Sequence, residues 1–96
     1  MLLSVFLFSL IVTLNPTVAL APAAVAITIA VTEPESLEGQ QMCIYVSDNE
    51  VWRSSCWPFL GTKRTTTTIK GFLEGQHRIW ATLSGKRSNV ATLEVH

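Results

Sequence analysis

The chain of 96 residues offers few side chains that could carry out catalysis or bind a metal. It contains one aspartate, Asp48, and two histidines, His77 and His96. An enzyme site needs a nucleophile or substrate within reach of an acid or base, and a metal site needs three or four ligands. No carboxylate or thiol is placed to complete such a set around His77. The sequence therefore predicts no catalytic residues, no metal site and no cofactor.

Cys43 and Cys56 are the only cysteines in the sequence. Their spacing lacks the C-x-x-C pattern of metal and redox sites. If Asp48 and Asn49 form a hairpin turn, Cys43 lies opposite position 54 or 55, and a bulge in the returning strand brings Cys56 within reach. We therefore expect a Cys43–Cys56 disulfide that stabilises the domain by roughly 3 kcal/mol in the chain-entropy model.

Aromatic residues provide the candidate binding surface, because exposed rings stack on sugars and anchor protein interfaces. In the strand expected at residues 76–83, Trp80 shares one face with Arg78, and the opposite face carries Ile79, Ala81 and Leu83. If that apolar face lies in the core, Trp80 points outward. The candidate binding face for a protein or carbohydrate ligand is therefore Trp80, Arg78 and Trp57. In the alternative interpretation, Trp52 or Trp57 fills the core and Trp80 covers the rim of a sheet.

Charge is distributed unevenly along the chain. The seven basic and seven acidic side chains give no net charge, and the first charged residue is Glu33. The absence of a basic cluster argues against nucleic-acid binding.

The uncharged N-terminal segment resembles a targeting sequence. Residues 2–14 form an apolar run of signal-peptide length, shorter than a membrane-spanning helix. Small residues suit a cleavage after Ala23, so we expect a signal peptide at residues 1–23 and a secreted or extracytoplasmic protein. The alternatives are a membrane anchor formed by the uncleaved segment, which would be the only membrane contact, and a cytosolic domain with a hydrophobic N-terminal helix packed on it.

The rest of the chain, residues 24–96, shows short alternating runs separated by turn residues, and no helical periodicity. Residues 25–32 alternate large β-branched residues with Ala and Thr, which predicts a strand. Further strands are expected at residues 41–47, 51–54, 65–70, 76–83 and 88–96. Six or seven short strands without a helix predict a small all-β, antiparallel sandwich.

One stretch of twelve residues, Phe72 to Leu83, carries a Leu-x-x-Gly-x-His pattern followed by alternating hydrophobic residues. It resembles the corner before a long strand in immunoglobulin-like and fibronectin-III-like modules. The resemblance implies that Leu73 is a buried corner residue, that Gly75 makes the turn and that the ring of His77 packs on the corner. It implies an immunoglobulin-like sandwich without identifying a particular family. The cysteine spacing departs from that of typical immunoglobulin domains.

These features predict a non-catalytic binding or interaction module that is secreted or displayed at a surface. The alternative is an N-terminal accessory β domain of a larger membrane-anchored, extracytoplasmic protein that acts on carbohydrates, such as a glycosyltransferase. The sequence predicts neither the ligand nor the oligomeric state.

Overall fold

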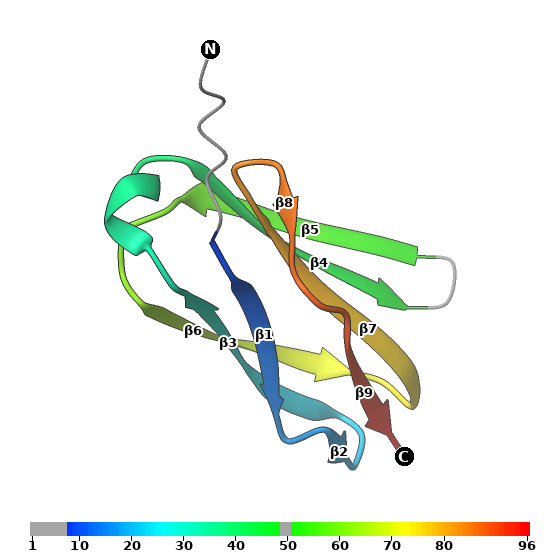
Figure 1. The fold of residues 1–96 in the computed structure, drawn as a ribbon. Helices are drawn as coiled ribbons and strands as arrows, with labels where there is room; N and C mark the ends of the chain where they lie inside the picture. Colours follow the sequence, from blue (N-terminus) through cyan, green and yellow to red (C-terminus); the bar gives the residue numbers. More distant parts are fainter. Residues whose placement is uncertain (1–7, 49–50) are drawn as a thin grey trace.

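A computed structural model describes residues 8–48 and 51–96, which form two β-sheets packed face to face (Figure 1). The described residues contain no α-helix and one short 3-10 turn, η1 (Pro34–Leu37). The nine strands in this part of the chain are β1 (Leu10–Asn15), β2 (Val18–Ala19), β3 (Ala23–Val31), β4 (Gln41–Asp48), β5 (Val51–Pro58), β6 (Arg64–Phe72), β7 (Gly75–Leu83), β8 (Lys86–Arg87) and β9 (Ala91–Val95).

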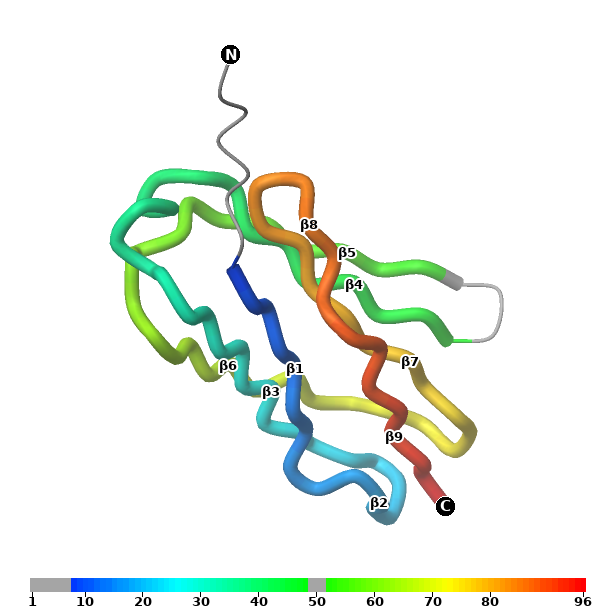
Figure 2. The backbone as a smooth tube through the Cα atoms, in the orientation of Figure 1, coloured from blue at the N-terminus to red at the C-terminus, as the bar shows by residue number. Residues whose placement is uncertain are grey.

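The smaller sheet has the strand order β1-β3-β6, and the larger sheet has the order β2-β9-β7-β4-β5, with β8 beside β7. Neighbouring strands are antiparallel, except that β2 runs parallel to β9. The strand β1 also contacts β7 and β9 of the larger sheet, which lie next to it in Figure 2. The protein is therefore an all-β sandwich, as the sequence predicts.

The core lies between the sheets and follows the period-2 alternation of the strands. In β3 the residues Val25, Ile27 and Ile29 are fully buried, whereas the intervening Ala and Thr side chains are half-buried on the outer face. In β7 the inward residues are Ile79, Ala81 and Leu83, as predicted. The connection after β5 places Phe59 in the core as well.

Each of the six strands expected from the sequence is present, as β3, β4, β5, β6, β7 and β9. The structure adds β1, β2 and β8 within the described residues. The strands β2 and β8 are two residues long, too short to show an alternating pattern. The strand β1 was not predicted because it overlaps the apolar run at residues 2–14, which resembles a signal segment.

The domain boundary expected after Ala23 differs from the structure, in which residues 8–23 belong to the sandwich. The strand β1 pairs with β3 along six residues, and Phe8, Leu10 and Val12 are buried in the core. Residues 1–7 of the expected signal peptide lie outside the described residues, so its cleavage stays a prediction. The described part of the chain contains no helix long and apolar enough to span a membrane.

Candidate functional site

Three aromatic residues cluster on the outer face of the larger sheet. The ring of Trp80 stacks on Tyr45 with centroids 5.7 Å apart, and Trp52 meets Trp80 edge-on at 5.0 Å. The cluster results from strand pairing, because β4 lies between β7 and β5. Trp80 on β7 lies opposite Tyr45 on β4, and Trp52 on β5 lies opposite Ser47 on β4. The Trp52 side chain therefore reaches across β4 toward Trp80. We call Tyr45, Trp52 and Trp80 the aromatic cluster.

Two arginines flank this cluster. The Arg87 guanidinium lies over the Trp80 ring, 4.8 Å from its centroid, which is within the range of a cation–π contact. Arg78 is exposed and precedes Trp80 by two positions on β7, so it faces the same side at a Cα distance of about 6.6 Å. Among residues 8–48 and 51–96, neither guanidinium lies within 4.0 Å of a carboxylate.

The exposure of the three rings differs from what the strand pattern alone suggests. Trp80 lies on the outer face, opposite the core residues of β7, but it is only 7% exposed because neighbouring side chains cover it. Trp52 is 63% exposed and presents the accessible indole. Trp80 therefore serves as the support, and Trp52 is the group that a ligand would meet.

The structure brings Trp80 and Arg78 together but places Trp57 elsewhere. Trp57 pairs with Met42 and packs against the core, on the opposite face of β5 from Trp52. The sequence singles out Trp52 as an aromatic residue, yet its association with Trp80 depends on the β4–β5 register. That register depends on which residues form the centre of the hairpin turn. Because turn-forming residues occupy several consecutive positions here, the sequence does not identify that centre.

Cys43 and Cys56 form a disulfide, as predicted from the sequence. They are direct partners in the β4–β5 ladder, so no bulge is required. The ladder ends with Asp48 opposite Val51, so the turn is centred one position later than the sequence predicts. The disulfide joins the two strands that carry Tyr45 and Trp52, on the same face as these rings.

His77 lies near the start of β7, next to the corner after β6, and is 5% exposed. Its Nδ1 contacts a carboxylate oxygen of Asp48, and its Nε2 lies 2.7 Å from the carbonyl oxygen of Leu73. The ring also packs edge-on against Phe72. Gly75 has a positive φ of 135°, a backbone conformation that favours glycine, as its expected turn role requires.

The Leu73 side chain is exposed rather than buried, so Leu73 contributes its carbonyl group to the corner. The neighbouring Phe72 is 1% exposed and fills the buried position instead. The bulged pairing of β6 with β3 places Phe72 opposite Ala23 at the edge of the core. The sequence pattern therefore locates the corner correctly but assigns the buried side chain to the wrong neighbour.

The His77–Asp48 pair resembles part of a catalytic triad, but its second ring nitrogen is already engaged. In such a triad the free nitrogen takes a proton from the nucleophile. Here Nε2 is bonded to a backbone carbonyl. Among the described residues no group of three or more His, Cys, Asp or Glu side chains could hold a metal ion.

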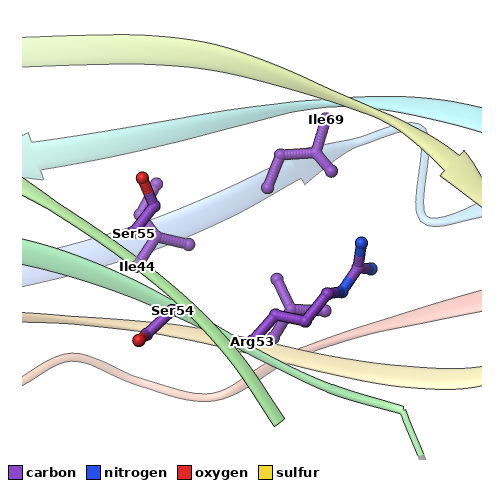
Figure 3. A pocket seen from close by; sticks show the side chains of 6 residues that line it. Ile44, Arg53, Ser54, Ser55 and Ile69 are labelled. Atoms are coloured by element: carbon purple, nitrogen blue, oxygen red, sulfur yellow. The ribbon is translucent and has the colours of Figure 1, made fainter. Parts of the chain in front are cut away.

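A small cavity of about 180 Å³ opens between the edge strands β5 and β6 (Figure 3). Ile44, Val46 and Ile69 form its apolar lining. Figure 3 shows Arg53 extending from β5 at the side of the cavity. The Arg53 guanidinium is bonded to Asp48 at 3.1 Å and lies over the Phe72 ring. The cavity is smaller than the roughly 300 Å³ typical of a small-molecule site.

Two further hollows, of about 410 and 300 Å³, lie beside Lys86 and beside Glu94. Residues of the aromatic cluster line none of these three spaces. The cluster therefore lies on the outer face of the larger sheet, apart from these three spaces, a position that suits a ligand lying along the surface.

No family model matches the chain, and no curated protein is similar to it in sequence at a significant level. Solved structures do share the fold. The CARDB domain of the PF1109 protein from Pyrococcus furiosus, solved in complex with di-metal ions, has a TM-score of 0.56 and 13% identity. The match covers 92% of this chain and 91% of that one.

Two larger proteins contain a similar region. A beta-glucosidase from Listeria innocua, solved with glucose, matches with a TM-score of 0.57 and 15% identity, over 92% of this chain but 16% of that protein. The alkylpurine DNA glycosylase AlkC from Pseudomonas fluorescens, bound to DNA containing an abasic site analog, matches at 0.59 and 8% identity, over 93% of this chain and 30% of that one. At such low identity these likenesses show the fold alone.

Proposed function

We propose that this protein is a non-catalytic, immunoglobulin-like interaction module, and that the outer face of its larger sheet is the contact surface. The observation that carries the proposal is the position of Trp52, which packs edge-on against Trp80 and is 63% exposed. A large exposed ring supplies much contact area for little conformational entropy.

The contacts around Trp52 restrict its side chain before a ligand binds. Trp80 is fixed between Tyr45 and the Arg87 guanidinium, and Trp52 rests edge-on against it. The disulfide ties β4 to β5 on the same face. A surface that is ordered before binding loses less entropy when the ligand arrives.

An extracytoplasmic location fits the disulfide, because oxidising compartments favour such bonds and the cytosol disfavours them. Cys56 lies on the exposed side of the edge strand β5, where a reducing environment could reach it. Secretion or display at a surface is therefore the setting in which the observed cross-link would persist.

A second candidate function is that of an accessory domain in a larger extracytoplasmic protein. It is favoured by the matches in which a region like this chain makes up 16% or 30% of a longer protein. Translation of the genomic reading frame on both sides of the 96 residues tests this candidate. An in-frame catalytic domain for carbohydrate chemistry supports it, and stop codons that bound the 96 residues contradict it.

The interaction role can be tested by screening the disulfide-bonded protein against a panel of purified glycans and extracellular matrix proteins. We expect W52A to weaken any specific binding by about tenfold, because it removes the exposed ring. The matched control is L60A, which removes another exposed apolar side chain (75% exposed) just beyond the opposite end of β5 from Trp52. Equal binding by W52A and the unmodified protein would contradict the assignment of this face.

A further inference from the structure

We infer that the aromatic cluster binds an anionic polysaccharide, with Trp52 stacking on a sugar ring while Arg78 and Arg87 bind its carboxylate or sulfate groups. This inference rests on the proposed function, since it names the ligand class for the same face. It combines three observations, namely the exposed indole, the two arginines and the polar residues around them.

The two guanidinium groups come from different strands of the larger sheet, β7 and β8. Arg78 lies in the same row of the sheet as Ser47 and Trp52, and Arg87 lies opposite Thr82 one row beyond Trp80. The two cations therefore bracket Trp80, and within the described residues no carboxylate lies within 4.0 Å of either one. A guanidinium presents a planar pair of N–H donors that matches a carboxylate or sulfate.

Charge on this face favours an anion. The outward residues of β4 and of the described part of β5 carry no charge, and β7 and β8 contribute Arg78 and Arg87. Among the described strand residues of this face the acid is Glu94 on β9, which pairs with Gln76 beyond Arg78 and lies 4.0 Å from His96. Arg78 and Arg87 therefore give the described part of this face a positive charge, although the chain as a whole has no net charge.

The neighbours of the cluster favour a sugar over a protein partner. Besides the disulfide, four outward residues around Trp52 and Trp80 bear hydroxyl groups, namely Ser47, Ser54, Thr82 and Thr92. Protein interfaces of ordinary size need a continuous apolar centre with about 800 Å² buried on each partner. A single exposed indole among hydroxyls and guanidiniums offers far less apolar area. It does match a sugar, which has one apolar C–H face and a polar rim.

The test uses three polysaccharide probes with the full, disulfide-bonded chain. Polygalacturonate carries carboxylates, dextran sulfate carries sulfates, and dextran is neutral. We expect binding to at least one anionic probe and none to dextran, with affinity that falls as salt is raised from about 0.05 to about 0.5 M. A preference between the two anionic probes identifies whether carboxylate or sulfate is recognised.

Variants separate the specific site from general charge attraction. W52A and the double variant R78Q/R87Q are each expected to weaken binding about tenfold or more. The matched control is K63Q/R64Q, which removes two exposed cations from the start of β6 in the other sheet. This control is expected to bind as the unmodified protein does.

Several results would overturn the inference. One is the absence of binding to either anionic probe, and another is a loss of binding in K63Q/R64Q as large as in R78Q/R87Q. A third is that polyglutamate, an anionic polymer without sugar rings, binds as tightly as both anionic glycans and does not need Trp52. Binding to dextran or to a protein that needs Trp52 but not the arginines would also overturn it. That last result would leave the proposed interaction role standing, so the two proposals fail in distinguishable ways.

Discussion

The side-chain amide of Asn89 forms two hydrogen bonds with the backbone of Val12, 77 positions earlier in the chain. The Val12 amide donates to Asn89 Oδ1 at 2.8 Å, and Asn89 Nδ2 donates to the Val12 carbonyl at 2.9 Å. Val12 lies in β1 of the smaller sheet, and Asn89 precedes β9 of the larger one. A single amide thus satisfies both polar groups of one β1 residue and links the two sheets.

Replacing Asn89 tests this link. We expect N89A to lower the free energy of unfolding by about 1–3 kcal/mol, because two part-buried backbone groups lose their partners. N89D is expected to be at least as destabilising, since its carboxylate cannot donate to the Val12 carbonyl. Denaturant unfolding measures both changes. A cost below about 0.5 kcal/mol, the usual range for an exposed substitution such as Q76A, would contradict the role of Asn89.

Truncation tests whether β1 belongs to the folded domain. A chain that begins at residue 24 loses β1, β2 and the buried side chains of Phe8, Leu10 and Val12. Burial of one such side chain contributes about 1.5–3 kcal/mol, and a domain is stable by only about 5–15 kcal/mol. We therefore expect the shortened chain to lack a cooperative unfolding transition by circular dichroism.

A chain that begins at Phe8 is the control for this truncation, because it keeps every described core residue. We expect it to unfold cooperatively. A stable, cooperative domain from residues 24–96 would show that β1 is dispensable and would restore the boundary expected from the sequence.

The disulfide is expected to stabilise the domain by lowering the conformational entropy of the unfolded chain. The double variant C43A/C56A should unfold with about 2–4 kcal/mol less free energy than the oxidised protein, because the cross-link restricts the unfolded chain. Reduction of the unmodified protein should produce a loss of similar size, and C43A/C56A should not respond to a reductant. A variant as stable as the oxidised protein would show that the cross-link adds nothing to folding.

The corner formed by His77 should depend on Asp48. We expect H77A to cost about 2–4 kcal/mol, since it leaves a cavity beside Phe72 and removes partners from Asp48 and the Leu73 carbonyl. A double-mutant cycle of H77A with D48N should show a coupling of about 0.5–3 kcal/mol. The exposed His96 provides the control H96A, whose stability should be unchanged. Additive effects of H77A and D48N would argue against a direct pair.

Local patterns determined much of this fold. Alternation in the segments that became β3 and β7 fixed their inward faces, because a strand must direct every second side chain to the core. Turn residues separated the strands correctly, and the two cysteines lay near enough in a hairpin to predict their disulfide. The outward position of Trp80 followed from the same alternation.

Tertiary structure decided the features that depend on distant partners. An apolar run such as residues 2–14 fits a leader or a buried strand equally well, and only its pairing with β3 assigns Leu10–Asn15 to the sandwich. Likewise, the ladder between β4 and β5 chose Trp52 rather than Trp57 as the neighbour of Trp80, because a shift of one residue moves every side chain to the opposite face. Composition and alternation are local properties, whereas pairing and register are settled when separate segments pack together.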